Sequence, residues 1–296
     1  MLISGYQNYQ NYRNQGYSNS PASPACPATP QRTHSSLNTL AAYNKHLVAF
    51  GWKPAKNQNK EILMQLAIIK YNLKKDVEEK FCGEIKATNK SGQEEVLNIY
   101  KTINKSNEKV YLVRKQDDNK TLIGAAIYTI KNNPVIKGLY NLQDNDDFSY
   151  ISGEYIFSTG QDEYIDLNLG KKLHQLRIET SILEGCPGKV LIYSAKTISD
   201  FIPTGFHYKN GFVPCKLIFE DDGLLRDNEA EKKIIKDMQK NKGYTSVKEI
   251  NMYLSSENFE NIWLKQILKN PLLDETKQKI SNSIVNQKAG WQQLSK

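Results

Sequence analysis

The side chains best suited to chemistry lie between Glu154 and Gly211. In this stretch a polar turn ends in Gly170, Lys171 and Lys172 and opens a long predicted helix. The first N–H groups of a helix have no partner inside it, and the helix dipole favours negative charge at that end. A strand followed by such a turn can therefore bind an anion, and the pattern suggests a phosphate-bearing cofactor.

Sequence patterns around this turn predict the elements that position it. A strand over 150–158 leads into the turn, and a helix over 169–183 follows it. Short β-rich runs predict two more strands, over 189–194 and 215–220. This order of strand, turn, helix and strand is typical of an α/β protein.

The chain before this region predicts two helices and a hairpin. Apolar residues at helical spacing indicate a helix over 62–77 and a second helix over 96–103. Residues 109–115 alternate apolar and polar side chains, and a β-rich run over 121–130 follows after a polar turn, which together predict an antiparallel hairpin. We expect residues 37–222 to form one α/β domain.

Beyond residue 222 the pattern becomes helical. It predicts helices over 229–240, 246–254, 258–268 and 274–285. We interpret residues 223–296 as a helical extension packed on the domain, because its charges are mixed rather than grouped in one run. Partner binding by these helices is the alternative.

The first 36 residues predict a disordered arm. Tyr, Asn and Gln dominate its first twenty residues, which offer few aliphatic side chains to offset the entropy of ordering. Prolines then recur at every third position, at Pro21, Pro24, Pro27 and Pro30, as they would along one face of a polyproline helix. We interpret the arm as a flexible spacer, with a docking motif and an export signal as alternatives.

Composition indicates a chain that folds in a cytosol. No window has the roughly 20 apolar residues of a membrane-spanning helix, and the N-terminus lacks the regions of a secretory signal. We therefore expect no membrane partner and a cytoplasmic location. The four cysteines are scattered without a close pair, so we expect buried free thiols rather than a metal site or a disulfide framework.

The net charge of +8 lies in the flanks of the chain. Residues 1–60 carry +6 and residues 223–296 carry +4, whereas residues 61–222 carry −2. Nucleic-acid binding by the folded body is therefore disfavoured, and binding by the basic arm is left as an alternative.

The turn and its flanking elements resemble the GNAT superfamily of acyl-CoA-dependent N-acyltransferases, over about residues 61–220. Members carry Gln/Arg-x-x-Gly-x-Gly/Ala between the fourth strand and the third helix, where backbone amides wrap the CoA pyrophosphate. In the matching window, 165–170, Gly170 fits, Asn168 replaces a glycine and Ile165 departs from the motif. The resemblance implies a mixed, mostly antiparallel sheet flanked by helices, and it implies acetyl-CoA as the co-substrate. The cofactor-binding residues that it implies in the turn are Asn168, Leu169, Gly170, Lys171 and Lys172.

Two further matches concern catalysis. Members with a glutamate base place it as Glu-x-x-Phe, sixteen residues before the last glycine, and Glu154 and Phe157 stand at that distance from Gly170. After the fifth strand the family often reads Phe-Tyr-x-Lys-x-Gly-Phe, and here His207 occupies the tyrosine position while Tyr208 follows it. Either group could protonate the departing thiolate, and we favour His207 because histidine gives up a proton more readily near neutral pH.

The resemblance therefore implies an N-acetyltransferase. Glu154 would deprotonate an amine that attacks the thioester directly, and backbone groups near Ser158 and Thr159 would hold the thioester and the pantetheine. The acids in residues 144–147 hint at a cationic acceptor, such as a lysine-bearing protein or a polyamine. The arm and the extension are compatible with a bacterial effector secreted into a host cell. The alternative is a protein-interaction module that keeps a GNAT fold with a degraded cofactor turn.

Overall fold

Six stretches of the chain are described by the structure, which is a computed structural model. They are residues 60–116, 121–158, 167–195, 203–218, 223–240 and 245–282. The predicted disordered arm, its proline repeat and the alternative export signal lie outside the described residues.

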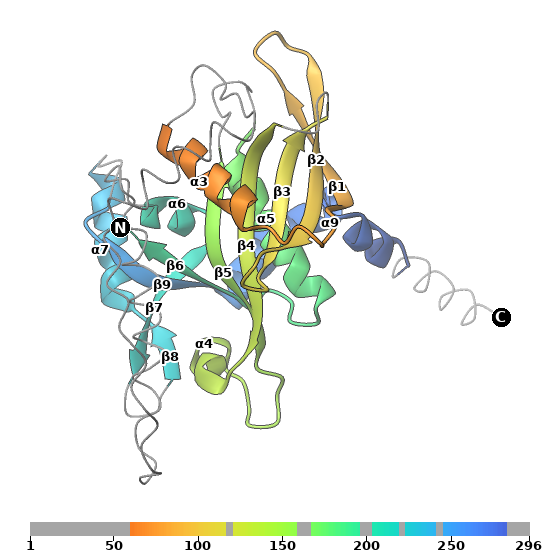
Figure 1. Cartoon of the computed structure of the whole chain (residues 1–296). Helices are drawn as coiled ribbons and strands as arrows, with labels where there is room; N and C mark the ends of the chain where they lie inside the picture. The colour runs from red at the N-terminus through yellow and green to blue at the C-terminus, as the bar shows by residue number, and fades with distance from the viewer. Residues whose placement is uncertain are drawn as a thin grey trace, which may run out of the picture. The chain divides into compact units, whose positions relative to one another are not determined.

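The described residues build one nine-stranded sheet with the strand order β1-β2-β3-β4-β5-β6-β9-β7-β8 (Figure 1). Neighbouring strands are antiparallel except β5 and β6, which run parallel. The strands are β1 (Lys80–Thr88), β2 (Glu94–Ile103), β3 (Lys109–Lys115), β4 (Leu122–Asn132), β5 (Ser149–Ser158), β6 (Val190–Ala195), β7 (Phe212–Ile218), β8 (Gly223–Arg226) and β9 (Glu249–Leu254).

Helices cover both faces of this sheet (Figure 1). Helix α5 (Leu169–Leu183) contributes Leu173 to a core that also contains Tyr111 of β3. Helix α3 (Lys60–Asn72) contributes Leu66 to a second core, which contains Leu112 of β3. Because successive side chains of a strand point to opposite faces, these two cores lie on opposite sides of the sheet.

Shorter helices lie between the strands or follow the last strand, β9. They are η1 (Pro134–Ile136), α4 (Lys137–Tyr140), α6 (Thr204–Lys209), α7 (Asn228–Gln239), α8 (Ser256–Asn258), η2 (Phe259–Leu264), α9 (Lys265–Lys269) and a helix over residues 274–282. None of the helices in the described stretches combines the length and the apolar character needed to cross a lipid bilayer.

The expected fold class is confirmed. The sheet is large and mostly antiparallel, and helices flank it. The predicted hairpin corresponds to β3 and β4, and the predicted strand, helix and strand around the anion-binding turn correspond to β5, α5 and β6. Helices also occur beyond residue 222, as expected.

Two predicted helices are strands. Residues 96–103 belong to β2, and residues 249–254 form β9, which lies between β6 and β7. Each strand contributes apolar side chains to both faces of the sheet, Leu97 and Tyr100 from β2 and Met252 and Tyr253 from β9, so adjacent apolar residues interrupt the alternation of a half-exposed strand. Because β8 and β9 join the same sheet, the part of the chain beyond residue 222 is not helical throughout.

Candidate functional site

The parallel strands β5 and β6 separate soon after they meet. They pair over three positions, from Ile151 opposite Val190 to Gly153 opposite Ile192. Beyond this point β5 continues beside β4, and β6 continues beside β9. Among the described residues, the two strands therefore diverge at the level of Gly153, and β5 continues to Ser158 before the chain reaches α5.

A β-bulge lies at this point of divergence. Ile127 of β4 is opposite Tyr155, and the next residue, Tyr128, is opposite Gly153. Glu154 is therefore an extra residue with no partner across the strand pair. Such a bulge bends its strand and redirects the side chain that it carries.

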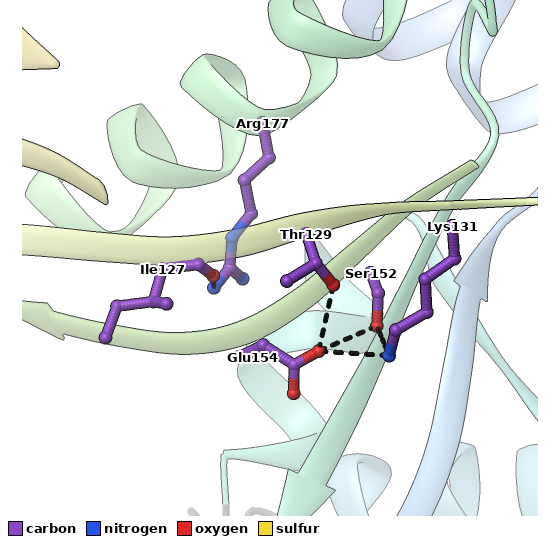
Figure 2. Close-up of polar contacts among 6 residues, drawn as sticks. All are labelled: Ile127, Thr129, Lys131, Ser152, Glu154 and Arg177. Atoms are coloured by element: carbon purple, nitrogen blue, oxygen red, sulfur yellow. Dashed lines mark hydrogen bonds and ion pairs between the residues drawn. The ribbon is translucent and has the colours of Figure 1, made fainter. Parts of the chain in front are cut away.

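Arg177 of α5 stabilises the bulge from the opposite side (Figure 2). Its guanidinium donates hydrogen bonds to the main-chain carbonyl oxygens of Ile127, at 2.7 Å, and of Tyr155. Glycine at position 153 allows this close approach, because a Cβ there would lie 2.8 Å from the Nη1 atom of Arg177. Arg177 is 2% exposed, and this burial lowers its pKa to about 9, so it still carries its charge at neutral pH.

Glu154 projects into a polar cluster formed by β4 and β5 (Figure 2). Its Oε1 atom lies 3.2 Å from the Nζ of Lys131 and accepts hydrogen bonds from Ser152, at 3.0 Å, and Thr129, at 3.4 Å. The side chains of Glu154 and Lys131 are 16% and 29% exposed. Glu154 is thus a partly buried carboxylate paired with an amine, a suitable arrangement for proton transfer.

A second carboxylate lies close to this cluster. Glu108 accepts a hydrogen bond from the side-chain amide of Asn104 at 2.6 Å. Burial raises the pKa of Glu108, and the negative charge of Glu154 adds to this effect, whereas the hydrogen bond from Asn104 and the charge of Lys131 oppose it. The positive charge of Lys131 therefore acts on two carboxylates, Glu154 and Glu108.

The side chain of Asn168 caps the N-terminus of α5. The Oδ1 atom of Asn168 accepts a hydrogen bond from the backbone N–H of Lys171 at 3.0 Å. The first turn contains no acidic residue, while Lys171 and Lys172 are half-buried there. Burial lowers the pKa of Lys172, and the adjacent Lys171 lowers it further. The turn is electropositive, although one of its backbone donors is already used.

Two residues of the predicted cofactor turn are packed inside the protein. Leu169 is fully buried in the core beneath α5. A Cβ at Gly170 would lie 2.9 Å from the ring of Phe206, so the glycine allows α5 to approach α6 closely. Ser158 is half-buried at the end of β5, and Thr159 lies outside the described residues.

The predicted proton donor His207 lies in an aromatic cluster. Its Nδ1 atom is 2.9 Å from the Nε2 atom of His174, and the rings of Phe206 and Phe212 pack against His174. Burial lowers the pKa of His207 to about 3, and the charge of Arg177 adds to the effect. His207 is therefore neutral at physiological pH.

Tyr208, the alternative donor, has a different environment. Its hydroxyl donates a hydrogen bond to Glu231 of α7 at 3.1 Å, and Glu231 also pairs with Arg226. Burial raises the pKa of Tyr208, and the negative charge of Glu231 raises it further. Among the described contacts, no hydrogen bond joins Glu154 to His207 or Tyr208.

The acids over residues 144–147 mainly stabilise their own loop. Asp144 pairs with Lys137 at 2.5 Å, and Asp146 accepts from the backbone N–H of Gln143. Asp147 accepts from the backbone and side chain of Ser149, and these two hydrogen bonds lower its pKa. These contacts give the loop a structural role besides any attraction for a cation.

The sequence contained signals for residues that sequence reasoning missed. Thr129 and Lys131 stand two residues apart, as do Ser152 and Glu154, which is the spacing of side chains on one face of a strand. Arg177 is one of two arginines in residues 61–222 and stands in a helix with many apolar positions. His174, which the sequence did not single out, is the buried partner of His207.

Comparison with known proteins gives no family. No family model matches the chain, and no curated protein matches its sequence. One solved structure, described as "Crystal structure of bacterial toxin", is 11% identical and aligns with a TM-score of 0.33, covering 52% of this chain and 71% of that chain. At this TM-score the likeness supports no statement about fold or activity.

Proposed function

We propose that the protein is an acyl-CoA-dependent N-acyltransferase. The observation that carries the proposal is the divergence of β5 and β6 at the bulge of Glu154, on the strand that precedes α5 in the chain. A parallel strand pair that opens beside a carboxylate and a helix N-terminus can receive a thioester substrate with an anionic tail. The resemblance to the GNAT superfamily assigns the same role to this part of the chain.

In this proposal the acyl-CoA supplies an activated acyl group, and the protein supplies positioning and proton transfer. The electropositive first turn of α5, with Lys171 and Lys172, binds the phosphates. Glu154 takes a proton from the ammonium of the acceptor, and the neutral amine attacks the acyl carbon. Arg177 holds the bulge, so that Glu154 keeps a fixed direction.

We assign protonation of the departing thiolate to Tyr208 rather than His207. His207 is 8% exposed, pairs with His174 and is held neutral by its low pKa, so it has no readily released proton. Tyr208 is half-buried, and its hydroxyl is protonated at neutral pH because the ordinary pKa of tyrosine is about 10. It is therefore the better acid of the two.

The acceptor in this proposal is a cationic amine. Glu154, Ser152 and Thr129 provide one carboxylate and two hydroxyls at the bulge, and they already contact the ammonium of Lys131 or one another. An external ammonium finds the same partners. A lysine side chain of a protein and a polyamine both fit this description.

Calorimetric titration of the full chain with acetyl-CoA tests the proposal. We expect saturable binding, and acyl transfer to an added amine that falls by about 100-fold in Glu154→Gln, because a general base contributes at least this much. The affinity for acetyl-CoA should change little in this variant. Glu184→Gln is a matched control, since Glu184 also pairs with a lysine but lies at the far end of α5. No binding at millimolar acetyl-CoA would refute the proposal.

One observation favours an interaction module without activity as the second candidate. Asn168 already accepts a hydrogen bond from an N–H of the α5 turn, and Phe206 covers Gly170. Both contacts reduce the number of backbone N–H groups that a pyrophosphate could reach in the α5 turn. The titration separates the candidates, because the module predicts no affinity for acetyl-CoA.

A further inference from the structure

We propose that Lys131 is an acyl acceptor within the protein itself and is acylated on its Nζ atom. This inference rests on the proposed function, because the same acyl-CoA supplies the acyl group. It identifies a modification site on β4, and it explains why a lysine lies against the candidate base.

The contacts of Lys131 are those that an acceptor ammonium requires (Figure 2). Its Nζ lies 3.2 Å from the Oε1 of Glu154 and donates a hydrogen bond to the hydroxyl of Ser152 at 2.9 Å. The Ser152 hydroxyl in turn donates to the same Oε1 atom at 3.0 Å. A base within hydrogen-bond distance of the proton that it removes satisfies the geometric requirement for general-base catalysis.

The position of this amine is fixed by the sheet. Lys131 belongs to β4 and Glu154 to β5, and the two strands are hydrogen-bonded on both sides of the bulge. The side chain of Lys131 remains 29% exposed, so part of it is in contact with solvent. Lys131 therefore combines a fixed partner with access from solvent.

The chemical step balances without any other reactant. Glu154 removes one proton from the Lys131 ammonium, and the amine nitrogen attacks the acyl carbon of the thioester. A C–N bond forms, the C–S bond breaks, and the second nitrogen proton is transferred to the departing thiolate, which leaves as a thiol. Glu154 then releases its proton to solvent.

Acylation would change the electrostatics of the site. The amide product carries no charge, so the ion pair with Glu154 is lost. The carboxylate then becomes available to the ammonium of an external acceptor. Unmodified Lys131 accordingly competes with that acceptor for the same partners.

The protein offers a matched control for this lysine. Lys109 pairs with Glu184 at 2.9 Å, and their side chains are 32% and 30% exposed. This pair resembles the pair of Lys131 and Glu154 in chemistry and exposure, but its acid lies at the C-terminal end of α5 and not on β5. Unassisted acylation by a thioester should not favour Lys131 over Lys109.

The first experiment incubates the purified full chain with acetyl-CoA and maps acetylated lysines by mass spectrometry. We expect one acetyl group on Lys131, acquired about 100-fold faster than on Lys109, as a positioned base predicts. Glu154→Gln should abolish this preference, whereas Glu184→Gln should not. Equal modification of Lys131 and Lys109 would overturn the inference, as would specific modification elsewhere that spares Lys131.

The second experiment measures binding of n-butylammonium in the absence of any CoA. Lys131→Met should bind this probe more tightly than the wild type, because the internal ammonium no longer occupies Glu154. Lys109→Met should bind it as the wild type does. If Lys131→Met binds n-butylammonium with the affinity of the wild type, then Lys131 does not occupy the acceptor position at Glu154, and the inference is refuted.

The two proposals fail in different ways. If acetyl-CoA does not bind, the acyltransferase proposal is refuted, and self-acylation with it. If acetyl-CoA binds and an added amine is acetylated while Lys131 stays unmodified, then self-acylation alone is refuted.

Discussion

The Nε2 atom of His174 and the Nδ1 atom of His207 lie 2.9 Å apart in a contact between α5 and α6. One nitrogen must donate a proton and the other must accept it, so at least one imidazole is neutral. Burial lowers the pKa of both histidines, and Arg177 adds a nearby positive charge. Both lowered pKa values therefore favour a pair in which both imidazoles are neutral.

Acid should weaken this contact. The folded-state pKa of His207 is about 3, below its ordinary value of 6.5, so the unfolded chain binds more protons between these pH values. Stability is complete above pH 6.5 and falls as the pH drops toward 3, by about 1.4 kcal/mol per pH unit for each such histidine. Urea unfolding at a series of pH values measures the slope. His207→Phe should show a shallower slope, and an identical slope would contradict this account.

Removal of the Arg177 guanidinium should destabilise the bulge. Arg177→Met leaves the buried carbonyls of Ile127 and Tyr155 without this donor, which costs about 1–3 kcal/mol for each unpaired group. Urea denaturation would measure the loss. Gly153→Ala should also be costly, because its Cβ meets Arg177 at 2.8 Å. In the double variant the alanine should cost less than in the wild type, and simple additivity would argue against this contact.

Much of the fold could be predicted from the sequence because local signals were consistent. Asn168 is a good N-cap, and Gly185 adopts φ +79°, which terminates α5 where the sequence indicated. The strands β2 and β9 were not recognised, because both contribute apolar side chains to both faces of the sheet and these residues mimic helical spacing.

The candidate site could be predicted only in part. Spacing along the chain selected Glu154, which does lie where β5 leaves β6. The bulge depends on the pairing between β4 and β5, and the contacts of Lys131 and Arg177 depend on how strands and helix pack. Such relationships join residues far apart in sequence, so a single sequence does not reveal them. The choice of His207 as acid overlooked His174 for the same reason.

The C-terminal helix should depend on a buried carboxylate of α5. Glu179 accepts hydrogen bonds from the backbone N–H groups of Leu272 and Leu273, both at 2.8 Å. In Glu179→Gln one of these donors would face an amide NH₂ group, a mismatch that costs about 1–3 kcal/mol. Hydrogen exchange should therefore accelerate over residues 272–282 while the central strands stay protected.

The contact of residues 272–273 with β1 provides an independent test of how this C-terminal segment is held. Gly83 of β1 contacts it so closely that a Cβ would lie 2.1 Å from the carbonyl oxygen of Leu272. Gly83→Ala should release the same residues as Glu179→Gln. Glu184→Gln, on the same helix, should leave their exchange unchanged. Equal protection from hydrogen exchange in all three variants would show that the contacts of Glu179 and Gly83 do not hold this segment.

Tyr208 should limit acyl transfer if it protonates the thiolate. Tyr208→Phe removes the hydroxyl with little change in volume, so we expect kcat to fall about 100-fold with acetyl-CoA affinity preserved. Unfolding by urea would verify that the fold is retained, and unchanged turnover would exclude Tyr208 as the acid.

The pH profile offers a sharper test of the same role. Tyrosine acts as an acid only while protonated, so activity should be lost as the pH rises through its pKa. Burial is the largest cause of the raised pKa of Tyr208, and the negative charge of Glu231 is the next. Glu231→Gln removes that charge, so the alkaline limb of kcat should move to lower pH. A limb that stays in place would mean that a group other than Tyr208 supplies the proton.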